Sequence, residues 1–289
     1  MVSIPSICFP DDDADKPVVY ESHAHTIFCG HATGATHDYC ERAIKLGLTG
    51  IIFTEHNPMP PTYEHQGRLQ AALIPSYVNV IERTRQYYRG ALDVRLGIEC
   101  DYLPEYESFV REQLSQYPFA YILGSVHCQF PNFQAYAKPS DGDHFEVTYF
   151  DLMARAAESG LFTALAHPHL CNVLLKRRTT RLPHIVNLFL DRLAATGVAL
   201  EINTGGLFYW DQVLYGGAIK RNIPIVVAGD AHEPAHVGEH FVQALQFLKR
   251  MEGKTISIFL DGERIDTPIR EALAHLAGAD EPTALVAGR

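Results

Sequence analysis

Short apolar runs alternate with amphipathic helical patterns along almost the whole chain, and few folds accommodate that order. Strand-like runs that each lead into a helix form right-handed crossover units, and such units place their strands in a parallel sheet. The sequence therefore predicts an α/β fold built on a parallel sheet. Seven runs carry the pattern, at residues 18–20, 50–54, 94–98, 121–126, 163–166, 198–202 and 223–228.

The segments between these runs have recognisable starts and stops. The first expected helix has Thr36 as a candidate N-cap and Gly47 in the stop position. Near the C-terminus, residues 255–260 and 264–265 flank Asp261 and Gly262, the residue pair of a tight hairpin turn. No linker or internal repeat divides the chain, so we predict one domain over residues 1–289, with an N-terminal extension at 1–17 and a tail at 279–289. The other helices are expected near residues 76–88, 105–117, 150–159, 184–195, 210–220, 241–250 and 269–276.

The charge and the cysteines of the chain exclude several classes of protein. The formal net charge is −10. This charge disfavours electrostatic binding of nucleic acid over a broad surface, because such binding depends on Lys and Arg displacing counterions from phosphates. No apolar run approaches the roughly 18 residues of a membrane span, and the N-terminal segment is acidic where a signal peptide would be basic and then apolar. We therefore expect a cytoplasmic protein without nucleic-acid or membrane partners, in which the six scattered cysteines are reduced.

Histidines and acidic residues stand directly after the strand-like runs. The C-terminal ends of parallel strands converge on one mouth of a closed barrel, so residues far apart in the sequence meet there. Alternate residues of an extended segment point the same way, which lets both imidazoles of His23-Ala-His25 approach one ion. The residues at these ends are His23, His25, His31, Glu55, His56, Glu99, Asp101, His127, His167, His169, Asp230 and His232.

The combined pattern indicates a metal site, although no single motif does. One histidine at a strand end is more often a hydrogen-bonded structural residue than a ligand, and an HxH pair alone is weak evidence. Six strands that deliver such residues at one end are better explained by shared cations, because crowded free imidazoles would repel one another on protonation. Mixed imidazole and carboxylate ligands suit zinc, manganese or iron better than magnesium or calcium, which prefer oxygen ligands.

These motifs resemble those of the polymerase and histidinol phosphatase (PHP) superfamily over essentially the whole chain. The segments HAHTIFCGH, GLTGIIFTEHNPMP, GIECDYLPEYES, GSVH, AHPHL, LEINTGGL and GDAHEPAHVG are most similar to its histidinol-phosphate phosphatase branch. The resemblance implies a single distorted seven-stranded (β/α)7 barrel of the TIM-like kind and three divalent ions. It implies one ion held by His23, His25, Glu99 and Asp230, a second shared by Glu99 with His127 and His167, and a third held by His31, His56 and His232.

The activity that the resemblance implies is hydrolysis of a phosphate monoester, with histidinol phosphate as the substrate. The metal ions would lower the pKa of a bound water, so that hydroxide attacks phosphorus, and would neutralise the phosphoryl oxygens. Asp230 or His232 is a candidate proton donor to the leaving alcohol, and so is metal-bound water. Glu55 and Glu201 are candidates for orienting the imidazoles, with an ordinary turn or solvent-facing role as the alternative.

Capture of a small phosphorylated substrate needs positive charge, and a basic segment follows the fifth strand-like run. An arginine fork matches the geometry of a phosphate group. His169 follows a candidate ligand and is a candidate for facing the substrate. Residues 207–210, largely aromatic, stand where members of the family commonly carry a basic residue, which leaves the exact substrate open. The candidate phosphate contacts are Lys176, Arg177, Arg178 and Arg68.

Three alternatives remain open. A PHP phosphodiesterase or nucleotidase would use the same chemistry on another ester, although such relatives more often carry TDH where this chain has Thr54-Glu55-His56. A non-catalytic barrel that binds metal or a partner would show no turnover. An amidohydrolase-like enzyme also uses HxH on a barrel, but it usually adds a lysine after a strand, and no lysine ends a predicted strand here. The oligomeric state is open as well, a homo-oligomer included.

Overall fold

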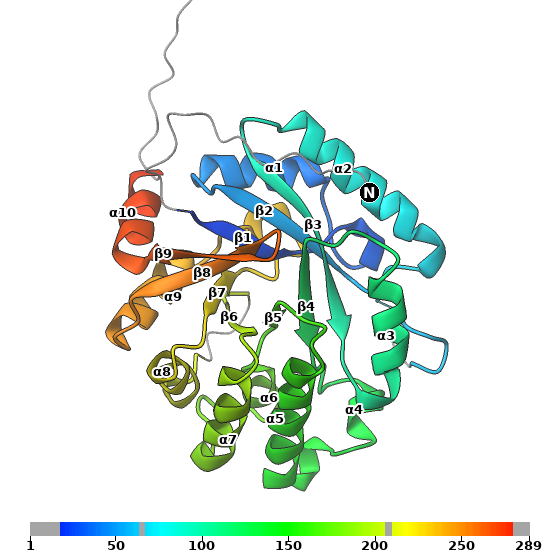
Figure 1. The fold of residues 1–289 in the computed structure, drawn as a ribbon, viewed down its shortest axis with the longest axis vertical. Coiled ribbons are helices and arrows are strands. Elements are labelled where there is room, and N and C mark those ends of the chain that lie inside the picture. Colours follow the sequence, from blue (N-terminus) through cyan, green and yellow to red (C-terminus); the bar gives the residue numbers. More distant parts are fainter. Residues whose placement is uncertain (1–17, 64–66, 206–209, 280–289) are drawn as a thin grey trace, which may run out of the picture.

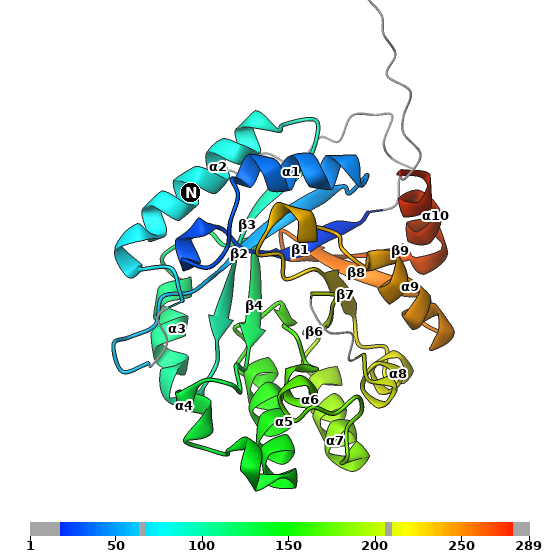
Figure 2. The ribbon, with the colours of Figure 1, turned by 180° about the vertical axis from the view of Figure 1, so that it is seen from behind.

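The computed structural model describes residues 18–63, 67–205 and 210–279. The predicted N-terminal extension, the predicted tail from residue 280 onward and residues 207–209 lie outside the described residues. Seven parallel strands form one sheet in sequential order, and helices surround it (Figures 1 and 2). The strands are β1 Tyr20–Ala24, β2 Gly50–His56, β3 Asp93–Asp101, β4 Tyr121–Ser125, β5 Ala164–Leu165, β6 Ala199–Asn203 and β7 Ile225–Ala228.

The sheet curls into a barrel whose last strand returns to its first. In the described chain β7 and β1 meet through one parallel bridge, between Ala24 and Ala231. The barrel is irregular, because β5 has two residues and the register of β1 against β2 shifts between Glu21 and Ala24. The predicted distorted seven-stranded (β/α)7 barrel is confirmed.

The helices follow the strands in the predicted order, with differences at their ends. Thr36 is the first residue of α1 and Ala35 precedes it as the N-cap, so the predicted cap was wrong by one residue. The fifth helix starts at Asp143, directly after Gly142, and is thus seven residues longer at its start than predicted. None of the helices in the described part of the chain has the length and apolar character that a membrane span requires. The helices are α1 Thr36–Lys45, α2 Ile74–Tyr87, α3 Glu107–Leu114, α4 Pro131–Gln134, α5 Asp143–Glu158, α6 Leu170–Leu174, α7 Pro183–Ala194, α8 Gln212–Lys220, α9 Phe241–Arg250 and α10 Ile269–Ala279.

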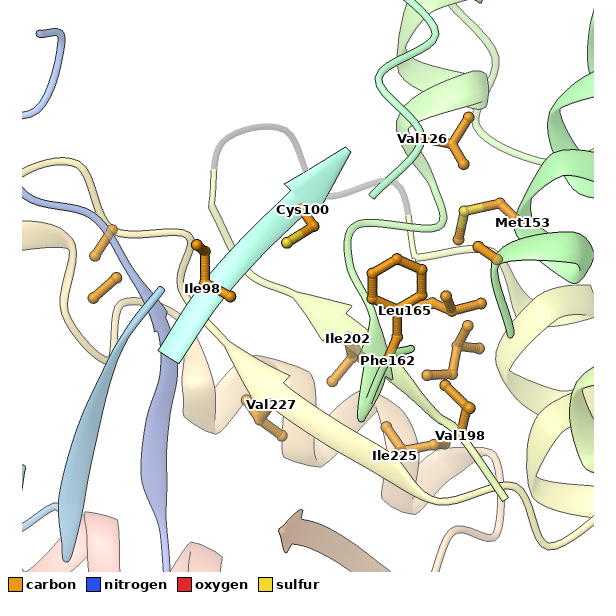
Figure 3. Packing of buried hydrophobic residues seen from close by; sticks show 14 of the residues in the cluster. Ile98, Cys100, Val126, Met153, Phe162, Leu165, Val198, Ile202, Ile225 and Val227 are labelled. Atoms are coloured by element: carbon orange, nitrogen blue, oxygen red, sulfur yellow. The ribbon is translucent and has the colours of Figure 1, made fainter. Parts of the chain in front are cut away.

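The core consists of two apolar clusters on opposite faces of the strands. Alternate residues of a strand point to opposite faces, so Leu200 and Ile202 of β6 join the cluster under the helices, while Ala199 joins the cluster inside the barrel. Figure 3 shows part of the outer cluster, in which Leu165 of β5 lies close to Phe162. Both faces of the strands are therefore buried, as in other barrels with a helical outer layer.

A hairpin closes the end of the barrel where the strands begin. Strands β8 Thr255–Leu260 and β9 Glu263–Pro268 are joined by Asp261 and Gly262, both with positive φ, as the predicted tight turn requires. Ile258 and Leu260 pack into the interior cluster, and β8 lies beside β7 (Figure 1). Arg95 of β3 holds the turn through its Nη1, 3.0 Å from Asp261. The predicted ligands lie at the opposite end of the barrel, where the strands finish.

Candidate metal centre

All nine predicted metal ligands lie where the barrel strands end. Three belong to β1, β2 and β3 themselves, and the others follow a strand or the short helix Ile27–Cys29. Six of these side chains are buried, whereas Asp230 and His232 are partly buried and His31 is exposed. The strand residues are His23, His56 and Glu99, and the residues beyond are His25, His31, His127, His167, Asp230 and His232.

Glu99 lies in the middle of the cluster and is fully buried. Burial opposes its ionisation, but attraction to His56 and His23 outweighs that effect and holds the pKa of Glu99 well below its usual range. The carboxylate therefore carries its charge at neutral pH. Its Oε2 lies 2.7 Å from His56 Nδ1, 3.5 Å from His23 Nε2 and 3.6 Å from His25 Nε2, and its Oε1 lies 3.0 Å from His167 Nε2 and 3.6 Å from His127 Nε2.

Asp230 supplies a second carboxylate next to the pair from β1. Its Oδ1 lies 3.2 Å from His25 Nε2 and 3.5 Å from His23 Nε2. Burial opposes the charge on Asp230, but both imidazoles favour it and hold its pKa well below the usual range. In return, the neighbouring carboxylates of Asp230 and Glu55 outweigh the effect of burial on His25 and raise its pKa to about 9. The negative charge of Asp230 is thus balanced by the positive charge of His25 at neutral pH.

Two carboxylates orient the imidazoles of His23 and His25. His23 Nδ1 lies 2.8 Å from Glu201 Oε2, and His25 Nδ1 lies 3.4 Å from Glu55 Oε1. A neutral imidazole that donates from Nδ1 presents the lone pair of Nε2 to a metal. The sequence left open whether Glu55 and Glu201 orient the imidazoles or have an ordinary turn or solvent-facing role. Both side chains are fully buried, and their positions support the orienting role.

Asp101 was noted at a strand end but was given no role by the sequence, and in the structure it orients His127. The two side chains meet at 2.5 Å between His127 Nδ1 and Asp101 Oδ1. Tyr63 and Arg68 donate to the other carboxylate oxygen. Burial opposes ionisation of Asp101, but Arg68 and His127 outweigh it and hold its pKa well below the usual range. The signal for this residue was its spacing, because Glu99 and Asp101 are alternate residues of β3 and point the same way.

Arg68 is buried beside the cluster and uses one of its guanidinium nitrogens in a contact with Asp101. Its side chain is buried, and its guanidinium carbon lies 4.8 Å from the centre of the Tyr63 ring. It pairs with Asp101, so its charge compensates a buried carboxylate. Its Nε and Nη1 have no hydrogen-bond partner among the described residues, so the predicted contact with a phosphate stays a prediction.

Six buried polar atoms of the cluster have no hydrogen-bond partner within the described structure. Each such atom costs about 1–3 kcal/mol when buried unpaired. Two of the six atoms, His56 Nδ1 and Glu99 Oε2, lie 2.7 Å apart without forming a hydrogen bond. Two ligands of one cation have this arrangement. Imidazole nitrogens and carboxylate oxygens fit a divalent metal. The atoms are Nε2 of His23, His25 and His232, Nδ1 of His56 and His167, and Oε2 of Glu99.

The ligand atoms fall into overlapping groups, within each of which they lie no more than 4.8 Å apart. Because the groups share members, the cluster is continuous from β1 to the segment after β7. His56 belongs to two of them and lies between the parts of the cluster. The groups are His23 with His25 and Asp230, His56 with Glu99 and His127, His25 with His56 and His232, Cys29 with His31 and His232, and His25 with Cys29 and Glu55.

The basic segment after β5 is held in place by a buried carboxylate. Glu146 of α5 accepts the backbone N–H of Leu182 at 3.0 Å and pairs with Arg177 at 3.1 Å. Lys176 and Arg178 are exposed, and neither has an ion-pair partner in the described part of the chain. These two side chains are therefore the free cations of the segment.

His169 is buried close to the ligands, and its Nδ1 has no hydrogen-bond partner among the described residues. Burial and repulsion from His167 lower its pKa to about 4. The imidazole is thus neutral at physiological pH and can accept or donate a hydrogen bond.

Comparison with known proteins identifies the family. The model of the PHP domain matches residues 21–205. A relative from Deinococcus radiodurans, named "Probable histidinol-phosphatase", is 35% identical over 252 residues, which cover 82% of this chain and 95% of the relative. The chain belongs to the PHP domain family. The histidinol-phosphatase of Bacillus subtilis is 26% identical and matches 75% of this PHP chain and 95% of the relative.

A solved structure supports the PHP barrel fold. The crystal structure of histidinol phosphate phosphatase from Lactococcus lactis, complexed with zinc, L-histidinol and phosphate, matches with a TM-score of 0.70 and 17% identity, over 86% of this chain and 98% of that chain. Together with the unpaired imidazole and carboxylate atoms, membership of the PHP family identifies the cluster as a divalent-metal site.

Proposed function

We propose that this protein is a metal-dependent phosphomonoesterase that hydrolyses L-histidinol phosphate to L-histidinol and phosphate, a step of histidine biosynthesis. The observation that carries the proposal is the 35% identity with a histidinol-phosphatase over nearly the whole length of that relative. The cluster of unpaired imidazole and carboxylate atoms provides the chemistry that such an enzyme needs. The Lactococcus lactis complex with L-histidinol and phosphate supports the same substrate.

The proposed centre holds three divalent ions of zinc, manganese or iron. The short distances around Glu99 and Asp230 support the first two sets of ligands. His56 lies near Glu99 as well as near His25 and His232, so it links the third set to the other two. The sets are His23, His25, Glu99 and Asp230, then Glu99, His127 and His167, then His31, His56 and His232.

Bound divalent ions would supply a water that ionises near neutral pH and positive charge for the phosphoryl oxygens. Asp230 and His232 were candidates for donating a proton to the leaving alcohol. Asp230 is held ionised, and burial together with repulsion from His25 lowers the pKa of His232 to about 4. Neither side chain carries an acidic proton at neutral pH. We therefore assign Asp230 and His232 the role of ligands, and water held by the ions is the remaining candidate for proton donor to the leaving alcohol.

Lys176 and Arg178 are the proposed contacts of the substrate phosphate, since both are exposed and unpaired among the described residues. Arg177 contributes charge nearby while it anchors the segment to Glu146. His169 would form a hydrogen bond with the substrate through its neutral imidazole. Arg68 stays a candidate contact of the phosphate through its Nε and Nη1, while Nη2 pairs with Asp101.

Phosphate release from L-histidinol phosphate tests the proposal, with protein reconstituted in zinc, manganese or iron. We expect turnover that depends on the metal and ceases in the presence of a chelator. Faster hydrolysis of bis(p-nitrophenyl) phosphate than of the monoester would favour a phosphodiesterase. Absence of turnover of any ester with every metal would favour a non-catalytic barrel and refute the proposal.

A further inference from the structure

The barrel closes between β1 and β7 with little backbone pairing. In the described structure the bridge between Ala24 and Ala231 consists of two hydrogen bonds: His25 N–H to the Ala231 carbonyl and Ala231 N–H to the His23 carbonyl, both 2.9 Å long. The segment that follows β7 carries Asp230 and His232. A regular ladder of strand hydrogen bonds therefore does not fix its position against β1.

The carboxylate of Glu21 spans this seam. Glu21 belongs to β1 and is fully buried. Its Oε1 accepts the backbone N–H of Gly229 at 2.8 Å and that of His23 at 3.2 Å. Its Oε2 accepts the backbone N–H of Gly238 at 3.0 Å. One side chain of β1 thus holds both ends of segment 229–238.

Glycine at position 229 allows this close contact. A Cβ atom at Gly229 would lie 2.5 Å from Glu21 Oε2 and 3.0 Å from the His236 carbonyl oxygen. Such distances are shorter than van der Waals contact, so any side chain would push the carboxylate away. Gly229 and Glu21 therefore fit each other as a pair.

The segment needs to be held, because Asp230 has a strained backbone. Its φ of 52° lies in the left-handed region, which disfavours residues with a Cβ atom. In this conformation Asp230 Oδ1 lies 3.2 Å from His25 Nε2 and 3.5 Å from His23 Nε2. Relaxation of the backbone would move the carboxylate away from both imidazoles.

We propose that Glu21 is a positioning residue that clamps segment 229–238 against β1 and thereby places Asp230 beside His23 and His25. The inference rests on the metal centre of the proposed function, but it assigns a task to a residue that touches neither metal nor substrate. In its absence Asp230 would lose its fixed position in the first ligand set.

The test is the metal affinity of Glu21→Gln, measured by calorimetric titration of the chelator-treated protein with zinc. An amide offers one acceptor oxygen where the carboxylate offers two, so the clamp releases at least one N–H group. We expect the apparent affinity to fall about 10- to 100-fold, the effect typical of residues that orient metal ligands. With glycine labelled with nitrogen-15, the amide protons of Gly229 and Gly238 should also exchange faster with solvent.

Glu146→Gln is the matched control, because Glu146 is another fully buried carboxylate that accepts backbone N–H groups. It should lose thermal stability but keep the metal affinity of the unaltered protein. Equal losses of stability in both variants with unchanged metal affinity would overturn the proposal.

Gly229→Ala provides a second route if Glu21→Gln does not fold. It keeps the carboxylate and forces a methyl group against it, so unchanged affinity in this variant would also overturn the proposal. The titration needs no substrate. Failure to hydrolyse histidinol phosphate would therefore refute the proposed function and leave this inference standing.

Discussion

Glu99 is the residue that the largest number of imidazoles in the centre share. Glu99→Gln keeps the shape of the side chain but removes the charge, so the surrounding imidazoles lose their common partner. We expect loss of bound metal and a fall in turnover of at least about 100-fold. Mutation of residues that only orient the ligands already lowers metal affinity or activity by about 10- to 100-fold. Elemental analysis and phosphate release measure both effects. Glu82→Gln, on an exposed pair with Arg85, is the control, and unchanged turnover in Glu99→Gln would refute the assignment.

Asp101 tests the orientation of one ligand without removing it. In Asp101→Asn the amide can donate to His127 Nδ1, which favours the wrong tautomer, and Arg68 loses its charged partner. We expect turnover to fall by about 10- to 100-fold while the protein stays folded. Asp191→Asn breaks an exposed pair with Arg221 and should leave the rate unchanged. Equal rates in the two variants would contradict the role of Asp101.

The charge state of the ligands predicts how metal binding depends on pH. In the metal-free protein the pKa of His25 is raised to about 9 and that of His23 lies well above its usual value. Both imidazoles are thus protonated at pH 7, and a metal must displace those protons. Affinity should rise with pH up to about 9, with protons released on binding. Calorimetry in buffers of different ionisation enthalpy measures the release, and an affinity that does not change between about pH 7 and 9 would contradict the prediction.

The sequence revealed the candidate ligands better than the residues that orient them. Ligands stand at strand ends, and a parallel barrel gathers strand ends, so the candidates could be read from the alternation, while the choice of nine ligands rested on the family resemblance. Orienting residues have no fixed spacing from their partners. Asp101 precedes His127 by 26 positions, whereas Glu201 follows His23 by 178. Such pairs depend on the barrel register, which sequence patterns do not specify.

The hairpin at the other end of the barrel offers a test at the level of one element. Gly262 has a φ of 84°, and a Cβ atom there would meet nothing within 4 Å, so Gly262→Ala changes the backbone energy without a clash. We expect about 1–2 kcal/mol of lost stability, the usual cost of the left-handed region. Thermal unfolding measures it. The exposed neighbour Glu263→Ala should cost less than about 0.5 kcal/mol, and an equal cost would contradict the turn assignment.

Element type was predictable and element ends were not. The runs at 50–54, 94–98 and 223–228 form β2, β3 and β7, although β2 and β3 continue beyond the predicted ends, to His56 and Asp101. The first strand extends to Ala24, beyond its predicted end, because the polar side chains of Glu21 and His23 are buried with partners there. A hydrophobicity pattern does not identify a strand whose polar residues face a metal centre. The functional end of the barrel is thus the part that such patterns describe least well.

At the scale of the whole molecule, apolar residues from Val19 to Leu276 share one cluster under the helices. That continuity agrees with the prediction of one domain, which stays a prediction for the full length of the chain. The alternation of strands and helices was enough to predict a closed barrel. It did not indicate that the closing strands share one bridge, because the residues there are glycines and polar groups rather than a second apolar run.

Metal removal tests the molecule as a unit, because a ligand that binds the native state stabilises every element that its site joins. The proposed ligands come from strands on both sides of the seam, so metal should raise the free energy of unfolding by about 2.7 kcal/mol at a free concentration 100 times the dissociation constant. That gain corresponds to a rise in melting temperature of about 4–5 °C for a chain of this size. The metal-free protein should remain folded, because protonated His25 and ionised Asp230 compensate each other. Calorimetric melting with a chelator and after addition of zinc measures the difference, and Glu99→Gln should show a smaller one. A melting temperature that metal does not change in the unaltered protein would show that these side chains do not gather around a cation.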